Sequence, residues 1–123
     1  MNNAFIDSSG GYKYINTGHA SQYEQSAGTH KFYSAASGTA DAAITFTQAM
    51  TLDAGGNLGI GTIFPNAASI IDAQSTTKGV RFPNMTTTQK NAIANVAGNV
   101  IFDTTLGKLC VNTGSGWQTI TSA

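Results

Sequence analysis

Residues Thr51–Thr62 read TLDAGGNLGIGT, and this stretch predicts a tight β-hairpin. The carboxylate of Asp53 can accept hydrogen bonds from the backbone that follows it, and the small residues at 55–57 tolerate positive φ angles. The chain can therefore reverse at little steric cost, and we expect it to do so between Leu52 and Leu58.

Glycine alternates with larger residues in the strand that follows this turn. Leu58 and Ile60 are expected to point to one side of the strand, whereas Gly59 and Gly61 leave the other side without side chains. A strand of this kind allows another stretch of backbone to approach closely. We therefore expect a close backbone contact on the glycine side.

Two other segments share the order of apolar strand, aspartate, small residues with glycine, and apolar strand. They are centred on Asp7 and Asp103, so that the pattern recurs about every 45 to 50 residues, close to the period of many structural repeats. A further reversal at 114–116 predicts a three-stranded meander from Val100 to Ile120. The sequence therefore predicts an all-β, fibrous fold of stacked β-hairpins.

One short helix is expected to interrupt the strands, over about residues 87–97. Thr86 and Gln89 have the spacing of a capping box at its start. The apolar residues at 92, 93 and 96 share one helix face, and Gly98 is a stop signal. Because a helix of about ten residues is marginal in water by itself, this one must pack on another element.

The composition is poor in charge. The 123 residues suffice for one domain, and only 10% of them are charged, compared with about 25% in ordinary globular domains. So few charges make a poor solvating surface for a small separate domain. The formal net charge is zero, so neither a nucleic acid nor an anionic membrane surface is an expected partner.

Membrane insertion and secretion are not indicated by the sequence. No apolar run approaches the roughly 20 residues that cross a bilayer, and the N-terminus lacks a basic region followed by an apolar one. We therefore expect a soluble chain. The single cysteine, Cys110, allows no internal disulfide and is expected to act as a small hydrophobic residue in a strand.

The hairpin pattern also predicts an obligate oligomer. Isolated hairpins are marginally stable in water, and open strand edges promote aggregation. A closed symmetric assembly would cover such edges and bury the apolar strand residues together, although the pattern does not set the number of subunits. The residues that we expect in the shared core are Leu52, Leu58, Ile60, Ile93, Phe102 and Leu109.

Three segments resemble tailed-bacteriophage tail fibres and related receptor-binding proteins. The first is the LDxxGNLGIGTxxP pattern at 52–65, and the second is KGVRFPNMTTTQKNAI at 78–93, which is similar to the family's MTTxQxxAI segment. The third, GNVIFDTTLGKLCVNTGSGWQTI at 98–120, resembles the closing unit of the same proteins. The resemblance implies an intertwined homotrimer, a non-enzymatic fibre module of a virion tail that is assembled in the host cytoplasm.

This resemblance suggests a role for each part of the chain. Residues 1–63 would form an N-terminal hairpin region for tail attachment or a shaft, and 64–98 a connector with a helical collar. Residues 99–123 would form a C-terminal meander at the tip. We expect the protein to bind tail or baseplate proteins through its N-terminal part and to adhere to a host-surface glycan or protein.

The receptor-binding residues are expected in the C-terminal meander. Trp117 follows a flexible turn and has the kind of side chain that stacks on sugars or anchors protein contacts, although burial in the core is the commoner fate of such a residue. The candidate set is Lys108, Asn112, Ser115, Trp117 and Gln118.

Two other functions are considered. The chain could be a structural connector that joins another fibre to the baseplate, or a tailspike hydrolase. A glycosidase needs two carboxylates about 5 to 10 Å apart, and the spacing of the acidic residues suggests no such pair. No nucleophilic triad is visible either, so we expect no enzymatic activity.

No cofactor or metal is expected. His19 or His30 on a threefold axis could present three imidazoles to a metal ion. A surface or hydrogen-bonded histidine is far commoner, because a metal site needs convergent ligands. The prediction for both histidines is therefore a structural or surface role.

Overall fold

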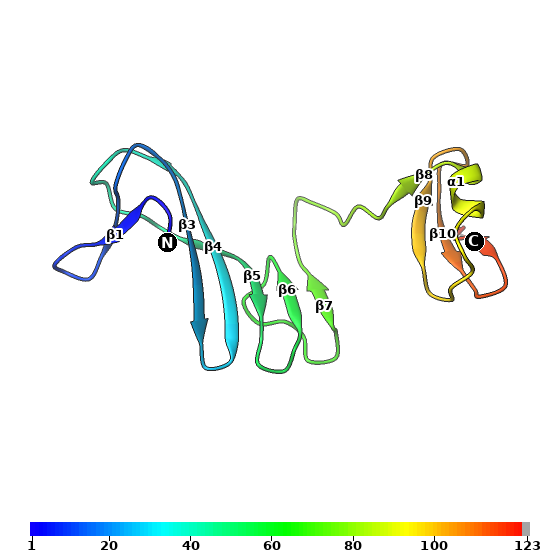
Figure 1. Cartoon of the computed structure of the whole chain (residues 1–123), viewed down its shortest axis with the longest axis horizontal. Helices are drawn as coiled ribbons and strands as arrows, with labels where there is room; N and C mark the ends of the chain where they lie inside the picture. Colours follow the sequence, from blue (N-terminus) through cyan, green and yellow to red (C-terminus); the bar gives the residue numbers. More distant parts are fainter. Residues whose placement is uncertain (122–123) are drawn as a thin grey trace. The chain divides into compact units, whose positions relative to one another are not determined.

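The computed structural model describes residues 1–121. The chain divides between Lys78 and Gly79 into two compact units, the N-terminal unit and the C-terminal unit. Nearly all regular structure is β-strand, and one short helix is present in the described part (Figure 1). The predicted all-β fold is therefore confirmed. None of the described helical structure is long and apolar enough to cross a membrane.

The N-terminal unit, Met1–Lys78, contains two sheets. A small antiparallel pair is formed by β1 (Ala4–Ile6) and β2 (Tyr12–Tyr14). The larger sheet has five strands in sequence order, as Figure 1 shows: β3 (Gly18–Ser26), β4 (Thr29–Gly38), β5 (Thr47–Leu52), β6 (Leu58–Ile60) and β7 (Ile71–Ala73). Neighbouring strands are antiparallel except β7, which pairs in parallel with β6 and was not predicted.

The predicted hairpin joins β5 to β6. Oδ1 of Asp53 accepts hydrogen bonds from the backbone N–H groups of Gly55 (2.9 Å) and Asn57 (2.8 Å). Gly56 has a φ of 85°, a conformation that costs glycine little. The turn therefore forms by the aspartate chemistry that the sequence indicates.

The β1–β2 hairpin repeats this turn around Asp7. Its Oδ1 accepts from the backbone N–H groups of Ser9 (2.9 Å) and Gly11 (3.0 Å), and Gly10 has a φ of 84°. Asp7 and Asp53 therefore have the same turn-forming role, as predicted.

The Asp7 turn is expected to weaken in acid. The hydroxyl of Ser9, followed by the backbone N–H groups of Gly11 and Ser9, lowers the pKa of Asp7 from 3.8 to about 2. Because the folded pKa is below the unfolded value, this contribution to stability is present above pH 3.8 and is lost as the pH falls through 2. An Asp7→Asn variant keeps an acceptor oxygen but cannot titrate.

We therefore expect Asp7→Asn to lose less stability than the wild type between about pH 4 and pH 2. Urea midpoints measured across this range check the prediction. Equal losses in the two proteins would show that ionisation of Asp7 does not stabilise the fold.

The glycine side of β6 is covered by the segment that follows it. A Cβ atom on Gly61 would lie 2.2 Å from the carbonyl oxygen of Gln74, and the φ of Gly61 is 72°. A Cβ atom on Gly59 would lie 2.8 Å from Cγ of Pro65. The predicted close backbone contact is confirmed, and the chain's own residues make it.

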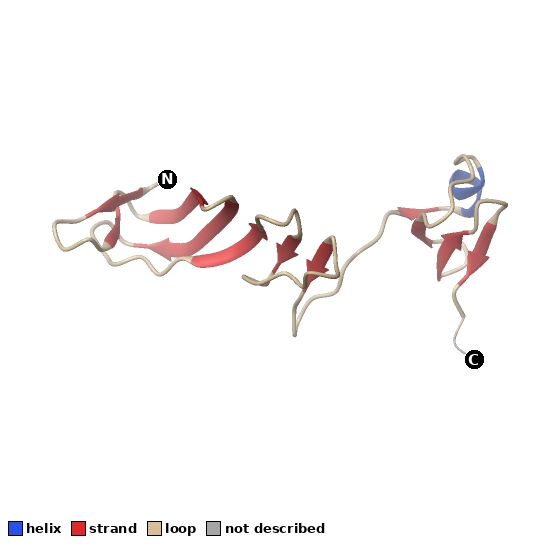
Figure 2. Ribbon diagram, turned by 90° about the horizontal axis from the view of Figure 1, so that it is seen from below, coloured by secondary structure: helices blue, strands red, loops and turns tan. Residues whose placement is uncertain are grey.

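The C-terminal unit, Gly79–Ala123, contains one sheet and the helix (Figure 2). The predicted meander is present as β9 (Val100–Asp103), β10 (Lys108–Asn112) and β11 (Trp117–Thr119). A fourth strand, β8 (Asn84–Met85), pairs in parallel with β9 and was not predicted.

The helix α1 spans Thr87–Asn91 and is shorter than the predicted 87–97. Its start is as predicted, because Thr86 and Gln89 form a capping box. The prediction of its end was wrong because tertiary contacts hold the following segment on β10. Oδ1 of Asn95 accepts from Nδ2 of Asn112 (3.0 Å), and the N–H of Gly98 donates to the carbonyl of Asn112 (2.8 Å).

Candidate functional site

The C-terminal sheet has two faces that differ in chemistry. Successive side chains of a strand point to opposite faces of the sheet, so the residues of β9 and β10 fall into two sets. Ile101, Asp103, Cys110 and Asn112 share the buried face, which α1 covers. Val100, Phe102, Leu109 and Val111 share the other, which we call the open face; they are exposed or half-buried.

An ion pair lies between the helix and the buried face. Nζ of Lys90 is 2.8 Å from Oδ2 of Asp103, and the two residues are 5% and 0% exposed. Nζ of Lys90 also lies 4.0 Å from Sγ of Cys110, which is fully buried. This pair fixes the helix on the sheet.

Asp103 has further hydrogen-bond donors. Oγ1 of Thr87 lies 2.8 Å from Oδ2, and the backbone N–H groups of Thr105 and Leu106 donate to Oδ1. Burial raises the pKa of Asp103, but the hydrogen bonds from Lys90 and these groups outweigh burial and lower it to about 2. Asp103 is therefore an ionised structural residue and a poor proton donor.

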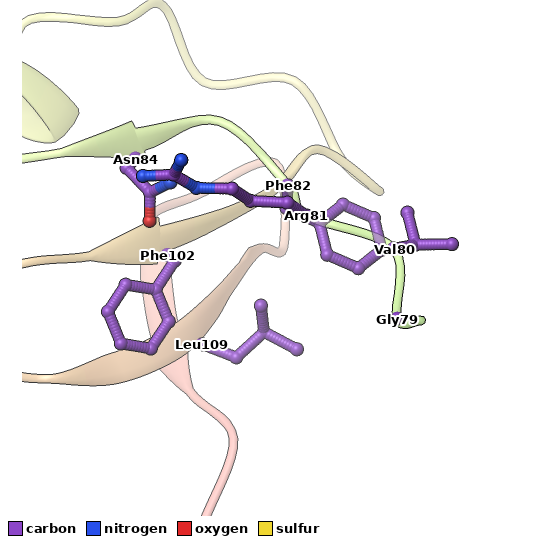
Figure 3. A pocket seen from close by; sticks show the side chains of 7 residues that line it. All are labelled: Gly79, Val80, Arg81, Phe82, Asn84, Phe102 and Leu109. Atoms are coloured by element: carbon purple, nitrogen blue, oxygen red, sulfur yellow. The ribbon is translucent and has the colours of Figure 1, made fainter. Parts of the chain in front are cut away.

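The open face borders a shallow apolar cavity. Its volume is about 360 Å³, and Figure 3 shows Phe102 and Leu109 on one side of it with Val80 and Phe82 on the other. Phe82 is 40% exposed and Phe102 36%. The single charged side chain among the lining residues is Arg81, which extends toward Asn84.

The predicted receptor-binding residues do not converge on one spot. Lys108 begins β10, whereas Ser115 lies in the turn at the far end of the β10–β11 hairpin. Trp117 is half-buried and pairs with Asn112, which places it on the buried face, and the exposed Gln118 points the opposite way.

Asn112, one of the predicted receptor-binding residues, is buried in the single chain. It is 1% exposed, and its Oδ1 accepts from the N–H of Gly114 (2.8 Å) while its Nδ2 donates to Asn95. Both groups of its amide are therefore used inside the chain. Its role is to hold the β10–β11 turn and the segment after the helix.

The predicted core residues all keep exposed surface in the single chain. Phe102 and Leu109 lie on the open face, and Leu52, Leu58 and Ile60 lie together on one face of the β5–β6 hairpin. Ile93, two residues after the helix, is 37% exposed. A shared core formed with other copies of the chain stays a prediction for all six.

The described residues contain no group of three or more His, Cys, Asp or Glu side chains that could hold a metal ion. His30 instead pairs through Nδ1 with the hydroxyl of Tyr23 (2.5 Å), and His19 Nδ1 lies 3.4 Å from the carbonyl oxygen of Ala35. Each histidine ring therefore has a polar neighbour within its own chain.

Comparison with known families identifies the region that contains this sheet. Residues 59–123 match the family model described as a phage tail like trimerisation region, which is 65 of the 123 residues (123 − 59 + 1). The chain belongs to this family. No curated protein and no solved structure matches the chain.

The trimerisation region includes the whole C-terminal unit and, in the N-terminal unit, the end of β6 and all of β7. The family supports a structural protein of a virion tail and a homotrimer. The earlier resemblance to phage tail proteins is therefore supported, whereas the fibre type and the adhesive role are not part of this match.

The sequence did not indicate the Lys90–Asp103 pair. Asp103 belongs to a turn motif, but nothing near Lys90 marks it as buried, and the two residues are 13 positions apart (103 − 90). The open face could be anticipated in part, because Phe102 and Leu109 lie in predicted antiparallel strands. Phe82 and Val80 could not, since β8 was not predicted.

Proposed function

We propose that this chain is a homotrimeric tail-fibre component in which the open face of the C-terminal unit is the contact between subunits. The observation that carries the proposal is a set of apolar side chains left exposed within a trimerisation region. Large exposed apolar patches commonly mark protein interaction sites. Interface cores are also depleted in charge, as this face is.

The contact between subunits can be tested with an Asp substitution at Phe102. The substituted carboxylate would be buried without a partner when three chains associate, and burial of an unpaired charge is strongly unfavourable. We expect Phe102→Asp to abolish the trimer while the monomer keeps its β-sheet circular dichroism. Sedimentation velocity measures the change.

The matched control is Leu106→Asp in the same unit. Leu106 is exposed in the β9–β10 turn and does not lie on the open face. This variant is expected to remain trimeric. A trimer formed by Phe102→Asp as readily as by the wild type would exclude the open face as the interface.

We propose no catalytic role for the chain. Most of its carboxylates already have partners: Asp7, Asp53 and Asp103 hold turns, Glu24 pairs with Lys31 (2.9 Å), and Asp72 accepts from the N–H of Asn66 (2.9 Å). These contacts support a structural role for the acids. Release of reducing ends from a capsular polysaccharide incubated with the protein would contradict this proposal.

We propose that the specific role of this tail-fibre component is adhesion to a host surface. The N-terminal part would attach to the tail, and the C-terminal meander would contact a glycan or a protein. Ser115 is exposed in the turn of the last hairpin, whereas Gln118 pairs with Val111 of the open face and would lie at the contact between subunits. Three copies of the Ser115 turn would strengthen a weak single site by avidity.

The competing function is a connector that joins another fibre to the baseplate. The wide separation of Lys108 and Ser115 along the hairpin favours it, because these residues cannot share one small site. The purified protein, mixed with cells that the parent particle adsorbs to, distinguishes the two. An adhesin binds the cells and blocks adsorption, whereas a connector does neither.

A further inference from the structure

The five-stranded sheet of the N-terminal unit carries a second uncovered apolar surface. Strand pairing aligns two rows of side chains on one face of this sheet, which we call the aromatic face. The first row is Tyr23, Phe32, Met50, Ile60 and Ala73, and the second row is Gln25, His30, Leu52, Leu58 and Ile71. The two rows therefore run across all five strands without a charged residue.

The opposite face has a different composition. Its middle row is Glu24, Lys31, Thr51, Gly59 and Asp72, so that three of its five residues are charged. The chain itself covers the centre of this face, because Oγ1 of Thr51 donates to the carbonyl of Thr62 (3.2 Å) and Pro65 packs on Gly59. The aromatic face has no such cover among the described residues, and Tyr23, Phe32 and Ile71 are exposed.

The polar atoms of the aromatic face are arranged so that the face can be buried. The rings of Tyr23 and Phe32 stack with centroids 4.7 Å apart, and the ring of His30 is nearly parallel to that of Tyr23, with centroids 6.0 Å apart. The Tyr23 hydroxyl meets Nδ1 of His30 (2.5 Å) and accepts from Nε2 of Gln25 (2.6 Å). Burial of this face would therefore leave few polar groups without a hydrogen-bond partner.

The position of the face in the chain indicates its occupant. Ile60, Ile71 and Ala73 belong to both the aromatic face and the trimerisation region, which begins at residue 59. The face is continuous from these strands through β5 and β4 to β3, outside the matched region. Aromatic residues and methionine are also the types enriched in interfaces between proteins.

We propose that a second copy of this chain covers the aromatic face, so that the trimer contact extends upstream of the trimerisation region to Tyr23 and Phe32. This inference rests on the proposed homotrimer and adds a new contact to it. Each copy then contributes the stacked aromatic pair of β3 and β4 to the interface. The trimer is incomplete without residues 23–52.

Photo-crosslinking tests the proposal in the full-length protein. With p-benzoylphenylalanine in place of Phe32, irradiation is expected to give covalent dimers and trimers. The matched control carries the same group in place of Lys31, which lies on the opposite face of the same strand. Its yield of covalent dimers and trimers is expected to be much lower than that of the Phe32 variant. Equal crosslinking at the two positions would overturn the proposal.

A charge substitution gives a second, independent readout. Phe32→Glu is expected to weaken association at least about 100-fold, because an unpaired carboxylate would be buried in each chain. The control, Gln22→Glu on the opposite face, is expected to leave association unchanged. A wild-type trimer that is unaffected by Phe32→Glu would overturn this inference alone, whereas a monomeric wild type would overturn the proposed homotrimer as well.

Discussion

Replacing Lys90 with methionine is expected to destabilise the C-terminal unit by about 3 kcal/mol, because removal of one partner leaves a buried charge unpaired. Asp103 is fully buried, and its carboxylate would keep its hydrogen bonds to Thr87 and the turn but lose the ammonium group 2.8 Å away. Methionine can fill the space of the lysine stem. Urea unfolding followed by the fluorescence of Trp117, the single tryptophan, measures the effect.

Lys13→Met is the matched control for this change. Lys13 also pairs with a turn-forming aspartate, Asp7, but at 3.4 Å and with more than a third of its side chain exposed. Such surface pairs contribute little, so we expect almost no change. The variants are compared at one chain concentration, because association shifts apparent stability. Similar losses in the two variants would mean that the Lys90–Asp103 pair is no more important than a surface ion pair.

Gly61→Ala is expected to disrupt the parallel pairing of β6 and β7. The added methyl group would lie 2.2 Å from the carbonyl oxygen of Gln74, so that backbone must move, and the φ of 72° is itself unfavourable for alanine. Together these effects should cost roughly 3 kcal/mol. Amide hydrogen exchange is expected to show loss of protection in Ile71–Ala73 and at Gln74, whose N–H donates to the carbonyl of Ile60.

Gly56→Ala separates the two causes. Gly56 also has a positive φ, 85°, but a Cβ atom there would meet nothing within 4 Å. The variant should therefore show only the conformational cost, about 1 to 2 kcal/mol, and should keep β7 protected from exchange. If Gly61→Ala proved no more damaging than Gly56→Ala, the close approach of residue 74 would be unimportant for stability.

The sequence predicted those parts of the fold that depend on neighbouring residues. The Asp7 and Asp53 turns form because each carboxylate accepts from N–H groups two and four residues later. The capping box of Thr86 and Gln89 is similarly local. Such contacts are encoded within five residues, and residue types alone suffice to recognise them.

The parts that were not predicted depend on contacts between distant segments. The strands β7 and β8 have only three and two residues, and a long connecting segment separates each from the strand with which it pairs in parallel. The helix ends early because Asn95 bonds to Asn112, 17 positions away. Neither feature leaves a periodic pattern in the sequence.

The candidate site illustrates the same division. Phe102 and Leu109 lie opposite each other in antiparallel strands, so alternation placed them on one face. The burial of Asn112 could not be foreseen, since asparagine is mostly a surface residue and its bonding partners include a segment expected to be helical. Lys90, a residue type almost never fully buried without a partner, was missed because its partner Asp103 is distant in sequence.

The central claim is that apolar faces left uncovered in the single chain are covered by two other copies of the same chain. The most direct test is the mass of the full-length protein in solution, measured by light scattering at several concentrations. We expect a stable species with three times the chain mass of 12.7 kDa. A monomer that persists at every concentration would contradict the account.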